Sequence, residues 1–381
     1  MKSFDKTQAP GDIFQFDCRY FLPDKPCVYH KSEGAICTCS HYEKVLRRIL
    51  IIKMGEAGDV LRTTGILKGL RKKYRGCHIT WVVSSHCREV LFENPLVDQI
   101  LAYSENTLAE LQARSFDLVI NLDLSCESSA LATLCKAEKK IGFGMTEEGH
   151  IVPLNPEAQE WFFMSLRDDL KKANRKTYPQ IIAEIVGVPY KKDPMILQLN
   201  AREVAMGKAF VREHKFPKTD FVVGLNTGAG QRWALKKWRI EGFLELIEKL
   251  STHPRIKIVL LGSELEKERN AYLARNSPVP LILGKTESSV REFFSIINIC
   301  DLLVTGDTLA LHAGLALRKK VIVLFGPTSP WEIELFGLGE KIVAPLDCIC
   351  CYKNTCDFKP NCMETISADR VLKSMKKFLR T

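Results

Sequence analysis

The sequence predicts two doubly wound α/β domains that face each other across a cleft, with cysteine-rich extensions at both ends. Apolar runs long enough for buried strands alternate with segments of helical periodicity, and such alternation implies parallel strands joined by crossover helices. The alternation runs twice, with a break near residue 200. Glycine turns follow four of the apolar runs, which end at Met54, Leu225, Leu261 and Val304.

The length and composition agree with this organisation. A chain of 381 residues exceeds one ordinary core and fits two domains of about 150 residues each plus extensions. The sequence has no run of 18 apolar residues and no signal-peptide pattern, so we expect an intracellular, cytoplasmic protein. The net charge of +10 indicates acidic partners, either a phosphate-bearing substrate or an anionic membrane surface. No RNA- or DNA-binding motif is present, so we expect no nucleic-acid partner.

The first domain is expected over residues 44–200, after an irregular extension over 1–43. Its opening strand is apolar throughout, as strands buried on both faces are, and Gly55 and Gly58 separate it from the next helix. The expected strands cover 45–54, 78–83, 98–103, 116–122 and 141–153, and the expected helices 59–74, 87–92, 108–113 and 161–187.

The second domain is expected over residues 201–345, after a connector over 189–199. It ends in a β-α-β unit in which a helix of small residues joins two short apolar runs. The expected strands cover 221–225, 256–261, 281–283, 299–304 and 321–325, and the expected helices 204–214, 238–250, 264–276, 290–297 and 309–316. Because ligands bind such sheets at the carboxyl ends of the strands, the four glycine turns should all face the cleft.

The turn after Met54 offers a candidate general base. Gly55 and Gly58 allow close backbone approach to a ligand, and Asp59 falls at a helix start. A carboxylate there can accept a proton from an attacking hydroxyl, and the helix dipole would keep it ionised. The structural alternative is that Asp59 only caps the helix.

The turns of the second domain suggest a phosphate site. Hydroxyls and open backbone amides at 226–230, followed by Lys236 and Lys237, form either a diphosphate cradle or a solvated basic helix start. Glu264 could accept from ribose hydroxyls. The turn at Gly306 places Asp307 and Thr308 at a helix N-terminus, which is either an anion site or an ordinary cap. His312 alone is more often a packed or capping histidine than a ligand contact.

Five stretches together resemble glycosyltransferase family 9, the ADP-heptose heptosyltransferases of lipopolysaccharide inner-core synthesis. They are IIKMGEAGDVLRTTGILKGLRKKY, NTGAGQRWALKKW, LLGSE, LLVTGDTLALHAGLAL and VIVLFGPTSP, in family order over about 44–335. The resemblance implies a GT-B fold with a sugar-nucleotide donor in the C-terminal domain and an acceptor in the N-terminal domain. It also implies inversion at the anomeric carbon without a metal or other catalytic cofactor.

Carried over by position, the resemblance assigns catalysis to Asp59 as general base and to Lys236 as a stabiliser of the departing diphosphate. Donor binding falls on Gly58, Thr227, Gly228, Gly230, Lys236, Glu264, Gly306, Asp307, Thr308 and His312. The expected reaction moves a heptosyl unit from ADP-heptose to a lipopolysaccharide-type acceptor, an anionic glycolipid or glycan at the inner membrane surface. The alternatives are transfer to a protein acceptor, transfer from another nucleotide sugar, or a non-catalytic binding module whose ends are held together by a metal.

The cysteines gather at the two ends of the chain. Thiolates in such clusters suit a structural Zn or Fe site, and related heptosyltransferases carry an iron-binding cluster. We expect either two sites or one shared site, because residues 346–381 should end in a helix that packs back on the first domain. The candidate ligands are Cys348, Cys351, Cys356 and Cys362 at one end and Cys18, Cys27, Cys37 and Cys39 at the other.

Overall fold

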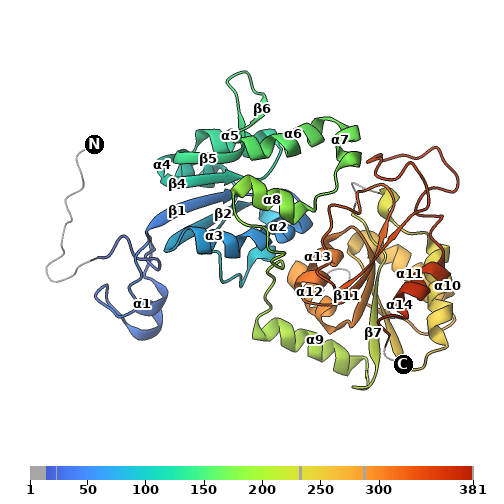
Figure 1. Cartoon of the computed structure of the whole chain (residues 1–381). Coiled ribbons are helices and arrows are strands. Elements are labelled where there is room, and N and C mark those ends of the chain that lie inside the picture. Colours follow the sequence, from blue (N-terminus) through green and yellow to red (C-terminus); the bar gives the residue numbers. More distant parts are fainter. Residues whose placement is uncertain (1–13, 23, 231–233, 286–288, 380–381) are drawn as a thin grey trace.

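The computed structural model describes residues 14–22, 24–230, 234–285 and 289–379. Its two α/β domains lie side by side, with helix α1 of the N-terminal extension and the C-terminal helix α14 on opposite sides of the molecule (Figure 1). Each domain is built on one six-stranded sheet. The predicted pair of doubly wound domains is therefore confirmed.

The first sheet has the strand order β3-β2-β1-β4-β5-β6. The pairs from β3 to β5 are parallel, whereas β5 and β6 pair antiparallel, so the stretch 141–153 forms a hairpin at the sheet edge. The strands are β1 (Arg47–Ile52), β2 (Cys77–Val83), β3 (Gln99–Ala102), β4 (Ser115–Asn121), β5 (Lys136–Met145) and β6 (Ile151–Pro153).

Helices cover both faces of this sheet (Figure 1). The expected helix over 161–187 is three separate helices, and the expected helix over 87–92 is a 3-10 segment at Ser85–Leu91. The α-helices are α1 (Val28–Glu33) in the extension and α2 (Ala57–Thr63), α3 (Leu67–Lys73), α4 (Glu105–Ala113), α5 (Cys126–Leu134), α6 (Gln159–Leu166), α7 (Asp168–Ala173) and α8 (Tyr178–Val186).

The second sheet is wholly parallel, in the order β12-β11-β10-β7-β8-β9. Its strands are β7 (Phe221–Asn226), β8 (Ile256–Leu261), β9 (Ile282–Leu283), β10 (Leu302–Gly306), β11 (Lys320–Phe325) and β12 (Gly339–Val343). Its helices are α9 (Ala201–Glu213), α10 (Ile240–Ser251), α11 (Lys267–Asn276), α12 (Val290–Ile299), α13 (Leu309–Ala316) and α14 (Ala368–Met375).

The strand order reverses between β1 and β4 in one sheet and between β7 and β10 in the other. At such a switch point the crossover helices leave to opposite faces and open a crevice at the carboxyl ends of the strands. The turns after β1, β7 and β10 are three of the four that the sequence marks with glycine, and the fourth follows β8.

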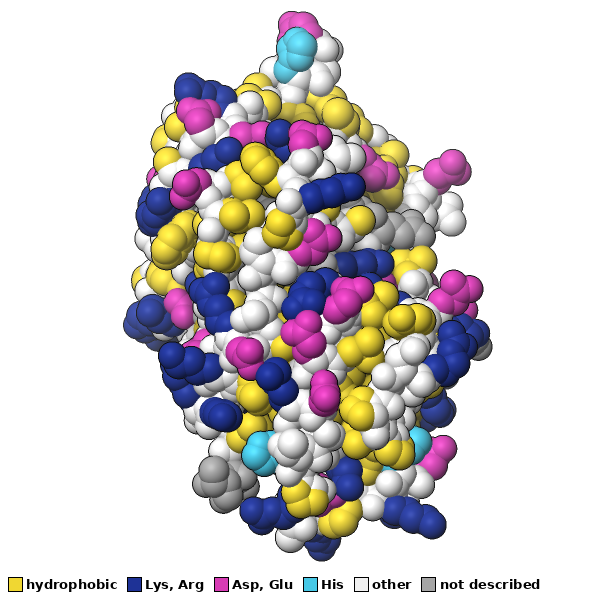
Figure 2. Space-filling view, turned by 90° about the vertical axis from the view of Figure 1, so that its right-hand side faces the viewer, with side chains coloured by type: hydrophobic (Ala, Val, Ile, Leu, Met, Phe, Trp, Pro, Cys, Tyr) yellow, Lys and Arg dark blue, Asp and Glu magenta, His cyan; other side chains and the backbone are white. Residues whose placement is uncertain are grey.

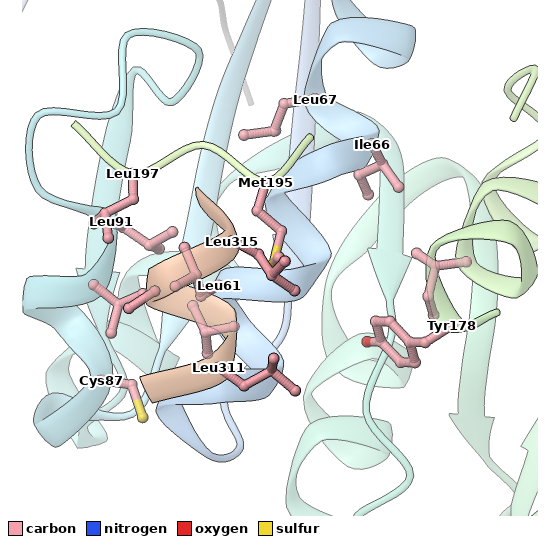
Figure 3. Packing of buried hydrophobic residues seen from close by; sticks show 14 of the residues in the cluster. Leu61, Ile66, Leu67, Cys87, Leu91, Tyr178, Met195, Leu197, Leu311 and Leu315 are labelled. Carbon is pink, nitrogen blue, oxygen red and sulfur yellow. The ribbon is translucent and has the colours of Figure 1, made fainter. Parts of the chain in front are cut away.

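Helices α2 and α13 pack against each other where the two domains meet. Leu61 of α2 and Leu311 and Leu315 of α13 belong to one buried cluster (Figure 3). A Cβ atom on Gly58 would lie 3.0 Å from Cδ2 of His312, so glycine allows this close approach. The packing places the turns of both domains next to each other.

The C-terminal helix differs from the prediction. Its apolar residues Val371 and Met375 are buried in a cluster with Trp238 and Phe243 of the second domain, and α14 lies beside α10 (Figure 1). The expectation that it packs back on the first domain is wrong, because the apolar surface that buries its stripe belongs to the second domain. No helix in the described ranges combines the length and apolar character that crossing a bilayer requires.

Candidate active site

A cleft of about 820 Å³ lies where the two domains meet. Its walls come from the start of α2 on one side and, on the other, from the turns after β7, β8 and β10 and the loop after β11. The molecular face in Figure 2 shows Lys and Arg side chains interspersed with Asp and Glu and no continuous basic stripe. The cleft is thus where the motifs of both domains converge.

Asp59 lies in the first turn of α2 and lines the cleft. The N-cap of this helix is Glu56, so Asp59 is not the capping residue. Its Oδ1 lies 2.9 Å from Nε of Arg62, and 35% of its side chain is exposed. Removal from water favours the neutral acid, but the positive charges of Arg62 and Lys53 outweigh this and hold the pKa of Asp59 below its ordinary value. The carboxylate is therefore ionised and open to the cleft.

Arg62 is fixed by an aromatic ring. Its guanidinium lies 3.6 Å from the centre of the Tyr178 ring, and the Tyr178 hydroxyl is 2.8 Å from Oγ1 of Thr63. Burial disfavours the charge of Arg62, yet the Asp59 carboxylate more than compensates and raises the pKa of the guanidinium. Arg62 thus remains charged beside the candidate base.

The opposite wall carries an ion pair at the turn after β10. Nζ of Lys236 lies 3.0 Å from Oδ2 of Asp307 and donates to its backbone carbonyl at 3.1 Å. Burial opposes the Asp307 charge, but Lys236 lowers the pKa of this carboxyl to about 2. Burial also lowers the pKa of His312 to about 4, so this imidazole is neutral at pH 7. Its Nε2 lies 3.9 Å from Oδ1 of Asp307.

The side-chain amide of Asn226 connects the turns after β7 and β10 by hydrogen bonds. The Asn226 side chain donates to the Gly228 carbonyl at 3.1 Å and to the hydroxyls of Thr305 and Thr308 at 3.1 and 3.2 Å. Thr308 is the N-cap of α13 but makes no side-chain capping bond in the described structure. The backbone amides and hydroxyls around these turns form a polar wall suited to an anion.

The structure places the predicted site residues in two groups. Those that line the cleft are Gly58, Asp59, Gly228, Gly230, Lys236, Asp307, Thr308 and His312.

Thr227, Glu264 and Gly306 are not among the described lining residues. Thr227 is only 1% exposed and its hydroxyl donates to Oδ1 of Asn270 at 2.5 Å. Glu264 pairs with Lys267 at 3.3 Å with 58% of its side chain exposed, while its neighbour Glu266 faces the cleft. Gly306 ends the buried strand β10.

Sequence reasoning missed three prominent lining residues, Arg62, Glu332 and Tyr352. Arg62 carries a usable signal, because a residue three positions after Asp59 lies on the same helix face. Glu332 lies two positions after the GPTSP motif, but no sequence motif includes it. Tyr352 lies among the C-terminal cysteines, where nothing in the sequence links it to the cleft.

The predicted metal sites are not formed. Nowhere in the described ranges do three Cys, His, Asp or Glu side chains converge to hold a metal ion. One shared site is also excluded in this arrangement, because the N-terminal extension and the C-terminal segment lie on opposite sides of the molecule (Figure 1).

Comparison with known proteins gives a consistent picture. Residues 106–361 match the family model described as glycosyltransferase family 9 (heptosyltransferase). Lipooligosaccharide heptosyltransferase 2 of Haemophilus influenzae is 24% identical over 310 residues, which cover 74% of this chain and 84% of the relative. Lipopolysaccharide heptosyltransferase 1 of Escherichia coli K12 is 24% identical over 317 residues, covering 77% and 92%.

Solved structures share the fold. A family 9 glycosyltransferase from Veillonella parvula superposes with a TM-score of 0.71 at 19% identity, covering 87% of this chain and 97% of that one. The ADP-heptose lipopolysaccharide heptosyltransferase II of E. coli gives 0.64 at 18% identity, covering 87% and 98%. The expected GT-B architecture is confirmed.

Proposed function

Because the chain belongs to glycosyltransferase family 9 and is a glycosyltransferase, we propose that it transfers a heptosyl unit from ADP-heptose to a lipopolysaccharide inner-core-type acceptor. The observation that carries this proposal is that a candidate base and a candidate diphosphate site lie on opposite walls of one cleft. An ionised carboxylate, Asp59, lines one wall, and a lysine-bearing polar turn, at Lys236 and Asp307, lines the other. Heptosyltransferase relatives over most of the chain support the sugar and the nucleotide.

In the proposed mechanism the acceptor hydroxyl attacks the anomeric carbon of the donor from the side of the first domain. Its proton passes to the Asp59 carboxylate as the new C–O bond forms. The bond between the anomeric carbon and the β-phosphate oxygen breaks, and ADP leaves with the electron pair. Attack opposite to the leaving group inverts the anomeric configuration.

The second domain stabilises the departing diphosphate. Lys236 exchanges part of its pairing with Asp307 for a phosphate oxygen, and the open amides around Gly228, Gly230 and Thr308 donate to others. We further assign the ribose end of the donor to the region of Ser263, Glu264 and Glu266 after β8. Thr227 contributes indirectly, through the buried hydrogen bond that fixes this turn.

We place the reaction at the cytoplasmic face of the inner membrane, where an anionic glycolipid acceptor would present its sugar. The net charge of +10 favours approach to an anionic surface. No nucleic-acid partner is part of this proposal.

The direct test is to incubate the purified chain with ADP-heptose and deacylated lipopolysaccharide core acceptors and to follow ADP release together with the mass of the acceptor. We expect ADP release with an acceptor mass increase of one heptosyl unit. Parallel reactions with ADP-glucose, UDP-sugars and peptide acceptors test the other donors and a protein acceptor. Absence of turnover from ADP-heptose with every acceptor would contradict the proposal and favour a non-catalytic binding module.

A further inference from the structure

A carboxyl and a phenol meet on the cleft wall that the second domain contributes. Glu332 lies in the loop after β11, and its Oε1 accepts a hydrogen bond from the Tyr352 hydroxyl at 2.9 Å. The same hydroxyl accepts from the backbone amide of Ser329 at 3.3 Å. Glu332, Tyr352 and Ser329 all line the cleft, although Tyr352 comes from the cysteine-rich C-terminal segment.

The backbone that carries Tyr352 is held in an unusual conformation. Cys350 and Tyr352 have φ values of +60° and +52°, in the left-handed region that side-chain-bearing residues rarely adopt. The amides of both residues donate to the loop after β11, Cys350 to the Gly326 carbonyl at 3.1 Å and Tyr352 to the Pro327 carbonyl at 2.9 Å. Such strain concentrates at functional sites, and here its effect is to place the phenol in the cleft.

Residues of the first domain also contact Glu332 and Tyr352. The backbone amide of Tyr178 donates to the Glu332 carbonyl at 2.8 Å, and Nζ of Lys171 lies 4.5 Å from the centre of the Tyr352 ring. Burial raises the pKa of Glu332, with the nearby charge of Arg62 opposing the rise. The carboxyl has two oxygens, each of which can accept a hydrogen bond from a sugar hydroxyl.

We propose that Glu332 and Tyr352 form a subsite that reads the hydroxyl pattern of the sugar on the donor nucleotide. This inference rests on the proposed glycosyltransfer. A carboxyl group matches a pair of neighbouring sugar hydroxyls, and a tyrosine ring offers an apolar face to the C–H side of a sugar together with a hydroxyl for bonding. The pair belongs to the same domain as the Lys236–Asp307 wall, so the sugar it meets is the one attached to the diphosphate.

The subsite gives the C-terminal segment a function that does not depend on a bound metal. The cysteine-rich segment donates backbone hydrogen bonds to the loop over 326–332, and its Tyr352 is one of the two side chains that would recognise the sugar. A site built to hydrogen-bond a substrate hydroxyl discriminates strongly against an analogue that lacks or misplaces it. Donor choice should therefore change when these two side chains change.

The test uses Glu332→Gln and Tyr352→Phe, with Tyr190→Phe as the matched control. Tyr190 donates to Oε2 of Glu334 at 3.2 Å in the same kind of pair, and neither residue is among the described cleft-lining ones. For each protein, calorimetry gives the Kd for ADP and for ADP-heptose, and kinetics give kcat/KM for ADP-heptose and ADP-glucose.

We expect each subsite variant to lower kcat/KM for ADP-heptose by about tenfold or more and to reduce its ratio to ADP-glucose, as loss of one substrate hydrogen bond does. The Kd for ADP should stay within about twofold in all variants, since ADP carries no sugar beyond the diphosphate. Tyr190→Phe should behave as wild type.

Equal weakening of ADP and ADP-heptose, an unchanged donor ratio, or an effect confined to the acceptor KM would overturn the assignment. The calorimetric Kd values test this inference separately from the proposed function, because they do not require turnover. If the wild-type chain turns over no donor, a selective loss of ADP-heptose affinity with ADP affinity intact still supports the subsite, and equal affinities still contradict it.

Discussion

Nε of Arg62 lies 2.9 Å from Oδ1 of Asp59, one helical turn further along α2. The guanidinium is itself held against the Tyr178 ring, so the candidate base has a fixed, charged partner. A carboxylate held in this way is aimed into the cleft and stays ionised at neutral pH. This pairing is central to how the cleft could remove a proton.

Replacing Arg62 by Met should move the acidic limb of the pH–rate profile to higher pH. Asp59 must be ionised to accept a proton, and its pKa lies below the ordinary value of about 3.9. Removing the Arg62 charge leaves Lys53, together with His312 once this imidazole is protonated near pH 4, as the positive groups facing Asp59, against the negative charge of Asp307. The carboxylate is then less stabilised, and its pKa rises.

The measurement is kcat/KM against pH for the wild type, Arg62→Met and Arg62→Lys, with carbon NMR of the Asp59 carboxyl as a readout independent of activity. Arg62→Lys keeps the charge and should restore most of the wild-type profile. If Arg62 has only a structural role, its replacement would lower kcat/KM equally at every pH, and the acidic limb of the pH–rate profile would not shift.

Replacing Lys236 by Met should lower kcat by about 10² to 10³ while the chain stays folded, as loss of one preorganised donor to a developing charge does in other enzymes. The Lys236 ammonium contacts Asp307 on the cleft wall at 3.0 Å. Lys257→Met is the matched control, because Lys257 pairs with Asp220 at 3.5 Å and neither residue is among the described cleft-lining ones. Equal rate losses in the two variants would show that Lys236 has no special role.

Replacing Asp123 by Ala should lower the free energy of unfolding by about 3 to 5 kcal/mol, the usual cost of removing one partner from a buried ion pair. Asp123 contacts Nζ of Lys53 and accepts from the backbone amides of Met54 and Gly55, so it fixes the glycine turn after β1. Chemical denaturation measures the effect. Asp169→Ala, which removes an exposed pair with Arg167 at 2.6 Å, should leave the unfolding curve unchanged.

The fold was predictable because its main signals are local. Most of the central strands contain an apolar run, and each cleft turn contains glycine, so the alternation and the ends of β1 and β7 can be read directly. The strand β12, GEKIV, has no such run and was not expected. The packing site of α14 was not predictable, because an apolar stripe such as Val371 and Met375 says that a helix is buried but not against which domain.

The candidate site was predictable only where it follows the strands. Asp307 comes directly after β10, and Asp59 and Lys236 lie in the segments that follow β1 and β7, so all three lie at the carboxyl edges of the two sheets. Tyr352 reaches the cleft through a loop whose path depends on left-handed backbone at Cys350 and Tyr352, which the sequence does not mark with glycine. The cysteine spacing suggested metal ligands, yet spacing alone does not fix where the thiols point.

The central claim, that Asp59 removes the proton from the acceptor hydroxyl, is tested most directly by Asp59→Asn. The variant keeps the shape of the side chain and a hydrogen-bonding oxygen near Arg62 but cannot accept a proton. With ADP-heptose and acceptor, we expect kcat to fall by about 10² to 10⁴ while the Kd for ADP stays unchanged. A variant that transfers the sugar at the wild-type rate would contradict the account.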